Sequence, residues 1–152
     1  MNQILYLSRA DVEAVGLPMS EIIEALDRMF REKGEGRVEM PPKPGIHTRK
    51  DAFIHAMPAY IPSLESAGMK WVSGYPENQQ RGLPYITGLL ILNSTETGLP
   101  IAVMDCVWLT GMRTGAATAV AAPVRLAVIQ VASMTVMGMP VSGSLRISRP
   151  VM

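Results

Sequence analysis

Between residues 53 and 105 the sequence divides into short apolar segments separated by residues that form turns. Such segments are typical of strands when they are rich in branched and aromatic side chains and are bounded by Gly, Pro, Asn or Asp. The predicted strands are Phe53–Ala59, Gly68–Ser73, Tyr85–Leu92 and Ile101–Asp105. The string NSTETG, residues 93–98, is rich in turn formers and is expected to join the last two strands as a hairpin.

Helical patterns precede this run of strands. A short strand is predicted at Ile4–Leu7, and Ser8 after it is expected to cap a first helix that carries Asp11 in its first turn. A second helix is amphipathic, with apolar residues at helical spacing on one face and charged residues on the other. Ser20 is predicted to cap this helix and Gly34 to end it.

The segments on either side of the strands complete the fold prediction. The proline-rich string GRVEMPPKPGIH, residues 36–47, is not expected to be helical. Alanines and strong helix formers predict a third helix from Val107 to about Ala122, and Met134–Met137 is expected to form one more strand. Strands clustered between helices indicate an α+β fold with a mixed, largely antiparallel sheet and flanking helices.

Composition excludes several classes of protein. Hydrophobic residues make up 48% of the 152 residues and charged residues 18%, so a packed core is expected. The net charge is +1 and no basic block is present, which argues against a nucleic-acid-binding surface. The single cysteine, Cys106, excludes an internal disulfide framework, and we expect it to be a small buried hydrophobe.

One uncharged stretch, Leu126–Leu145, is long enough to raise the possibility of a membrane span. It contains several Ser, Gly and Pro residues, which favour a buried strand followed by a loop instead. The N-terminus begins with a short apolar piece and a charged helix, which is not the pattern of a signal peptide. The expected location is therefore the cytoplasm.

Three basic residues have neighbours that are typical of a core. Lys70 lies between apolar residues of a predicted strand, Arg113 lies near the start of a helix that is otherwise made of small and apolar residues, and Lys43 follows two prolines. A buried cation is costly unless it is paired, so the pattern indicates an anionic partner. A small carboxylate would fit, with Arg113 binding it through two parallel hydrogen bonds. The alternative is that each side chain extends to water.

The two histidines and two residues near the third helix allow fewer conclusions. His55 alternates with apolar residues in its strand and could face either a pocket or solvent, whereas His47 is expected to be solvated. No further His, Asp or Glu stands at ligand spacing, so no metal site is predicted. Asp105 and Trp108 lie where a strand meets a helix and are expected to cap and to pack there.

A glycine motif follows the last predicted strand. Gly138 and Gly143 stand at the first and third positions of a G-x-G-x-x-G dinucleotide fingerprint, but Pro140 replaces the middle glycine. Proline adds a ring and removes an amide donor at the point where the backbone approaches the phosphates. By itself the motif is weak support for cofactor binding, because two glycines after an apolar run are common.

Five longer strings occur in the order found in one family. The chain resembles the ornithine cyclodeaminase/mu-crystallin family, including its archaeal-type alanine dehydrogenases, from residue 1 to about residue 122. The strings that carry the resemblance are HAMPAYI, AGMKWVSGYPEN, GLPYITGLLILN, ETGLPIAVMD and LTGMRTGAATAVAA. Beyond Ala122 the resemblance is faint, although MTVMGMPVSG stands where the family has its strand and glycine loop.

The resemblance implies a two-domain organisation. Residues 1–122 would form an α+β substrate-binding and dimerisation domain, and residues 123–152 a truncated, degenerate start of a Rossmann domain. Family members are dimers that bind NAD or NADP. They interconvert small amino acids with imino or keto acids by hydride transfer, as dehydrogenases, imine reductases or cyclodeaminases.

The resemblance also implies roles for individual residues. Arg113 matches the family's carboxylate-binding arginine, Lys70 its pocket lysine, expected to be catalytic, and Lys43 a basic position that faces the same carboxylate. Thr114 would contact the cofactor. His55 stands where cyclodeaminases have an acidic residue and alanine dehydrogenase-like members an arginine, so the subclass stays open.

The family's catalytic aspartate lies in the Rossmann domain, outside this chain. We therefore expect the chain alone to have negligible activity and not to bind NAD or NADP, since the cofactor performs the hydride step. One alternative is a non-catalytic small-molecule-binding or dimerisation module, similar to mu-crystallin. Another is a small membrane protein built on the apolar C-terminal stretch.

Overall fold

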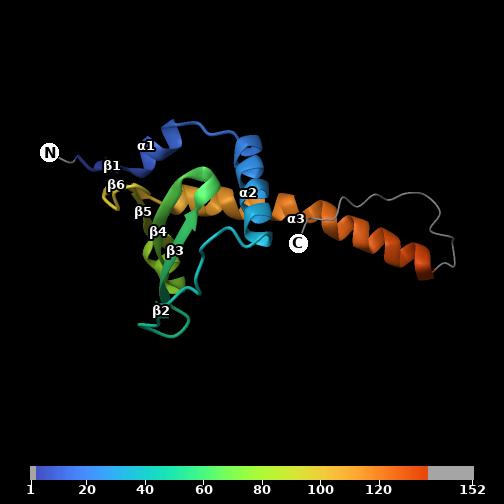
Figure 1. Cartoon of the computed structure of the whole chain (residues 1–152). Coiled ribbons are helices and arrows are strands. Elements are labelled where there is room, and N and C mark those ends of the chain that lie inside the picture. The colour runs from blue at the N-terminus through green and yellow to red at the C-terminus, as the bar shows by residue number, and fades with distance from the viewer. Residues whose placement is uncertain (1–2, 137–152) are drawn as a thin grey trace.

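A computed structural model describes residues 3–136 of the chain, and the side chains up to residue 122. Six strands form one sheet in the order β1-β6-β5-β4-β3-β2 (Figure 1). Their bounds are Leu5–Leu7 for β1, Gly45–Ile46 for β2, Phe53–Ile61 for β3, Ser66–Gly74 for β4, Ile86–Asn93 for β5 and Pro100–Asp105 for β6. Neighbours are antiparallel except for β1, which is parallel to β6. The predicted α+β class, the mixed sheet and the β5–β6 hairpin are confirmed.

The first helix begins as the sequence predicts. Helix α1 (Arg9–Ala14) is preceded by Ser8, whose hydroxyl accepts a hydrogen bond from the Asp11 amide at 3.3 Å. The Asp11 carboxylate in turn accepts one from the Ser8 amide at 2.8 Å. This reciprocal pair satisfies two amides that the first turn leaves without partners.

The start of the second helix differs from the prediction. Helix α2 (Met19–Gly34) is preceded by Pro18, which has an extended backbone and makes no side-chain cap. Ser20 lies inside the first turn, so its hydroxyl is not placed to cap the helix, and the predicted cap is wrong. Gly34 is the last helical residue, as expected, and Gly36 provides the left-handed turn with φ of 74°. Two short 3-10 helices, Pro62–Leu64 and Pro76–Arg81, follow β3 and β4.

Helix α3 (Val107–Val136) is longer than predicted. It continues through Pro123, so residues 134–136 are helical and the strand predicted at Met134–Met137 is wrong there; Met137 lies outside the described residues. The buried strand expected within Leu126–Leu145 is also wrong for the part of that stretch that is described, because residues 126–136 are helical. A short apolar run fits a buried strand and a helix equally well, and helical hydrogen bonds form locally without a partner strand. No helix within residues 3–136 has the length and apolar character that a membrane crossing requires.

The two faces of the sheet differ in what covers them. Side chains alternate along a strand, and Lys70 and Val72 of β4 point toward α3, where Val72 is buried. Helix α3 packs in turn on α2, which crosses it in Figure 1. Trp71 and Leu89 lie opposite each other on β4 and β5 and point to the other face, where they are exposed. The core therefore lies between the sheet and the helices.

Candidate functional site

The Lys70 side chain lies at the junction of β4 and α3. It is half-buried, and its Nζ donates a hydrogen bond to Thr110 Oγ1 on α3 at 3.4 Å. Partial burial lowers the pKa of Lys70, and the positive charges of Arg113 and Lys43 lower it further. A lysine in these surroundings carries its charge at a cost, which an anion beside it would offset.

Lys43 and Arg113 lie near enough to Lys70 for their charges to act on it. Both side chains are exposed, which fits the alternative that they extend to water, whereas Lys70 is half-buried. Lys43 belongs to a segment without regular structure before β2, and Arg113 lies in the first turns of α3. Within the described residues, neither they nor Lys70 lie within 4.0 Å of a carboxylate. The structure thus gathers three cations without a protein carboxylate beside them.

His55 lies on the helix-covered face of the sheet. It pairs across β3 and β4 with the buried Val72, and directly paired residues of antiparallel strands share a face. Its ring stacks on Phe53 with centroids 4.4 Å apart and lies against Gly45, where a Cβ atom would come within 2.1 Å of the ring. Partial burial lowers the pKa of His55, and the charge of Lys43 lowers it further. His55 therefore faces the same side as Lys70 and not open solvent.

The residues where β6 meets α3 have structural roles, as predicted. Cys106 is fully buried, and burial raises the pKa of its thiol. Asp105 Oδ1 accepts a hydrogen bond from the Val107 amide at 2.9 Å, at the start of α3. Trp108 is partly buried. His47 is exposed, and its ring meets that of His55 edge-on at 6.3 Å.

Thr110 is the site residue that the sequence did not indicate. Its hydroxyl accepts a hydrogen bond from Lys70 and donates one to Cys106 Sγ at 3.9 Å. It stands four residues after Cys106 and three before Arg113, the spacing that places residues on one face of a helix. That spacing was the available signal, but it required knowing which face of α3 meets Lys70.

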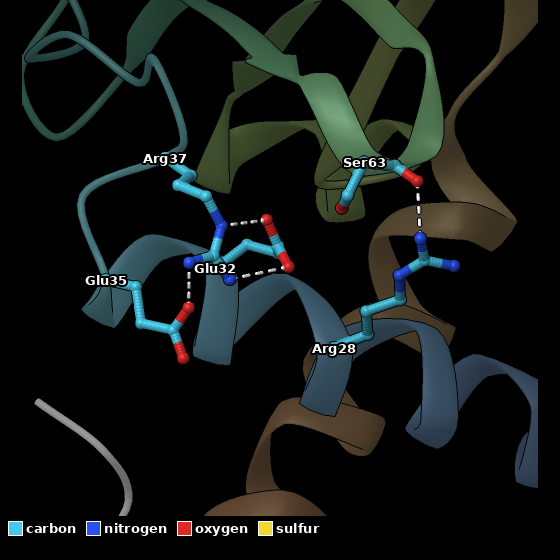
Figure 2. A network of polar contacts seen from close by, with 5 residues as sticks. All are labelled: Arg28, Glu32, Glu35, Arg37 and Ser63. Carbon is cyan, nitrogen blue, oxygen red and sulfur yellow. Dashed lines mark hydrogen bonds and ion pairs between the residues drawn. The ribbon is translucent and has the colours of Figure 1, made fainter.

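A polar network holds the chain segment that leads from α2 toward Lys43. Arg37, just after α2, donates to both carboxylate oxygens of Glu32, at 2.8 and 2.9 Å, and pairs with Glu35 (Figure 2). The hydrogen bond to Arg37 lowers the pKa of Glu32. Arg28 of α2 donates to the Ser63 carbonyl in the turn between β3 and β4, as Figure 2 also shows.

Backbone hydrogen bonds fix the same segment along β3. Glu39 and Tyr60 exchange two of them, at 3.0 and 2.8 Å, and the Ala56 amide donates to the Pro44 carbonyl at 3.0 Å. Lys43 stands between these two attachments, one residue before Pro44. The position of its backbone is therefore set by the sheet, although its side chain is free to extend.

The residues expected to bind a cofactor are described only in part. Thr114 is exposed, and its hydroxyl donates to the Thr110 carbonyl at 2.7 Å inside α3. Gly138 and Gly143 lie outside the described residues. Residues 3–136 therefore show no glycine loop between a strand and a helix that would fit a pyrophosphate. Within the same range, no group of three or more His, Cys, Asp or Glu side chains could hold a metal ion.

Similar proteins share this region of the chain. Nodulation efficiency protein NfeD of Rhizobium meliloti is 50% identical over 117 residues, which are 77% of this chain and 37% of that protein. Alanine dehydrogenase of Archaeoglobus fulgidus is 42% identical over 120 residues, 79% of this chain and 36% of that enzyme. The chain thus spans about a third of the length of these relatives.

Solved structures give the same coverage. An archaeal alanine dehydrogenase dimer with bound NAD matches with a TM-score of 0.70 and 42% identity, over 75% of this chain and 34% of that one. The Δ1-pyrroline-2-carboxylate reductase of Thermococcus litoralis, in complex with NADH and L-proline, matches with a TM-score of 0.72 and 40% identity, over 76% and 36%. Residues 3–146 match the sequence model of the ornithine cyclodeaminase/mu-crystallin family. This chain therefore belongs to the ornithine cyclodeaminase/mu-crystallin family.

Proposed function

We propose that residues 1–122 form the substrate-binding and dimerisation domain of an enzyme that interconverts a small amino acid with its imino or keto acid, using NAD or NADP. The observation that carries this proposal is the half-buried Lys70, which has Arg113 and Lys43 near it and no described carboxylate within ion-pair distance. Relatives named as alanine dehydrogenase and pyrroline-carboxylate reductase support the same class of substrate.

The substrate carboxylate would bind between Lys70 and Arg113. Arg113 is three residues beyond Thr110 on α3, and its charge already acts on Lys70. A carboxylate placed there would accept hydrogen bonds from the Arg113 guanidinium and from Lys70 Nζ, replacing the long 3.4 Å contact to Thr110. Its negative charge would raise the pKa of Lys70 toward the ordinary value.

His55 and Lys43 would complete the wall around the substrate. With its pKa lowered, the His55 ring is neutral near pH 7 and presents one donor and one acceptor nitrogen. Lys43 adds a second exposed cation on the same side. Lys70, as the least exposed of the three cations, is the residue best placed to hold a proton next to the reacting carbon.

We expect the 152-residue chain tested alone to bind carboxylates without turning them over. Bound NAD or NADP would supply the hydride acceptor or donor, but among residues 3–136 only Thr114 is a candidate cofactor contact. The other two candidates, Gly138 and Gly143, belong to residues 123–152, which we assign to the start of the nucleotide-binding domain.

Calorimetry with pyruvate and L-alanine tests the site directly. We expect saturable binding that weakens by at least about tenfold in Arg113→Ala, because charge-assisted hydrogen bonds are lost. Arg9→Ala is the matched control, since Arg9 is an exposed arginine on α1 that pairs with Glu13 at 2.7 Å. Equal binding by the wild-type chain and Arg113→Ala would remove Arg113 from the proposal. Enhanced NADH fluorescence on mixing would contradict the expectation of no cofactor binding.

The open face of the sheet is the proposed dimer interface. Its exposed apolar side chains come from neighbouring strands, with Trp71 43% and Leu89 46% exposed at paired positions. Burying such a face against a second copy removes apolar surface from water. The archaeal alanine dehydrogenase relative is a dimer, which supports the same assembly here.

A further inference from the structure

A cavity lies at the end of β4, on the sheet face opposite the Lys70 site. It has a volume of about 360 Å³ and is lined by two arginines, one acid and four uncharged polar residues: Arg49, Arg81, Glu77, Ser73, Thr87, Tyr75 and Asn78. Ser73 and Thr87 are paired across β4 and β5, one residue along from Val72 and Gly88, so they point away from α3. The cavity therefore shares no wall with the Lys70 site.

The loop that carries Arg49 is held at both sides of this residue. The hydroxyls of Thr48 and Tyr75 are hydrogen-bonded at 2.6 Å, which ties the loop to the end of β4. The Arg49 carbonyl accepts a hydrogen bond from the amide of Ala52, which is buried. Arg49 itself is exposed, and no described carboxylate lies within 4.0 Å of it.

The loop that carries Arg81 is fixed as well. Asn78 donates from its side chain to the Pro84 carbonyl at 3.1 Å, and its own carbonyl accepts from the Leu83 amide at 2.9 Å. Gly82 ends the 3-10 helix in the left-handed region, with φ of 68°. Arg81 contacts Glu77 at only 3.6 Å, with both side chains about 60% exposed, and an ion pair of this kind contributes little.

The chemistry of this lining selects a small anion. Arginines from two separate loops line the cavity together with Ser73 and Thr87, whose hydroxyls are hydrogen-bonded to each other at 2.9 Å. Arginine forks match the paired oxygens of phosphate, and each hydroxyl has a further donor or acceptor position to offer. The volume is at the lower end of the range for small-molecule sites. We propose that this cavity is a binding site for a small phosphate-bearing ligand, complete within one chain.

Titration of the full chain with inorganic phosphate, followed by amide NMR, tests the site. We expect saturable shifts at the amides of Ser73, Asn78 and Thr87. In the double variant Arg49→Gln/Arg81→Gln the affinity should fall by at least about tenfold, because both charged donors are lost. Arg9→Gln is the control and should change the affinity by less than about twofold, since Arg9 lies on α1 outside the cavity.

Three results would overturn the proposal. Shifts that never saturate, or that survive in the double variant, would mean that phosphate does not bind in this cavity. Citrate binding more tightly than phosphate would replace the phosphate class with a polycarboxylate. Loss of binding in Leu89→Asp, which changes the adjoining apolar patch and not the cavity, would mean that the site needs a second copy of the chain.

Discussion

The two faces of the sheet differ although the same strands build both. On the helix-covered face, Lys70 contacts Thr110, Val72 is buried and Gly88 lies against Cys106. On the open face, Trp71 and Leu89 are each more than 40% exposed. Because side chains alternate along a strand, neighbours in sequence serve different purposes. One face closes the core around a cationic site, and the other remains available for association.

The comparison predicts that added volume is not tolerated where the helix-covered face of the sheet is closely packed. A Cβ atom at Gly88 would come within 2.2 Å of the Trp71 carbonyl oxygen and 3.1 Å of Cys106 Sγ. Backbone cannot move aside as a flexible side chain can. We therefore expect Gly88→Val to lower the free energy of unfolding by about 3 kcal/mol or more, measured by urea denaturation.

Gly111→Ala provides the matched control for this prediction. Gly111 is in α3, and a Cβ atom there would meet nothing within 4 Å. Replacing a helical glycine by alanine should stabilise the chain by about 0.5–1 kcal/mol. Equal destabilisation by the two substitutions would show that the close approach at Gly88 is not what limits that position.

A charge on the open face should act on association instead of folding. We expect Leu89→Asp to weaken the proposed dimer by about 2 kcal/mol, roughly thirtyfold in the dissociation constant, because it removes a leucine from a buried interface. Sedimentation equilibrium measures this change. Leu83→Asp is the control, since Leu83 is also an exposed leucine, at 53%, but lies before β5 and outside the sheet. A dimer that is unaffected by Leu89→Asp would move the interface elsewhere.

Much of the fold could be predicted from local signals, and the site only in part. The bounds of β3, β5 and β6 follow from turn residues, which act within a few positions of the chain. Ser20 was misassigned because a serine near a helix start can be either the cap or a residue of the first turn. Residues 134–136 were misassigned because a short apolar run fits both a strand and a helix. The exposure of Arg113, and the part played by Thr110, depend on which face of α3 meets the sheet. That packing is set by contacts far apart in sequence, which periodicity does not report.

Asp105, where β6 leads into α3, should make a moderate contribution to the stability of the fold. Its carboxylate accepts from the Val107 amide at 2.9 Å where β6 leads into α3. Asp105→Ala leaves that amide without its acceptor and should cost about 1 kcal/mol of unfolding free energy, measured by urea denaturation. Asp27→Ala is the control and should cost less than about 0.5 kcal/mol, because Asp27 forms only an exposed pair with Arg31.

The smallest expected effect is a pH dependence that belongs to the helix-covered face. The pKa of His55 is lowered in the folded chain, so the unfolded chain binds more protons near this pKa. The stability that His55 contributes is fully present above the unfolded value of about 6.5 and is lost as pH falls through the folded pKa. His55→Gln should flatten the unfolding free energy over this range, and His47→Gln should leave most of the slope. If the unfolding free energy of His55→Gln keeps the same dependence on pH, His55 is not the group responsible for it.

The central claim is that Lys70 and Arg113 hold a carboxylate on the helix-covered face. The most direct test follows the Lys70 ε-carbon resonance, assigned with Lys70→Met, through a pH titration with and without saturating pyruvate. We predict that the pKa of Lys70 is low in the free chain and rises when pyruvate binds, because an anion then lies beside the ammonium group. A pKa of Lys70 that does not change while pyruvate binds would contradict the account, since the carboxylate would then lie elsewhere.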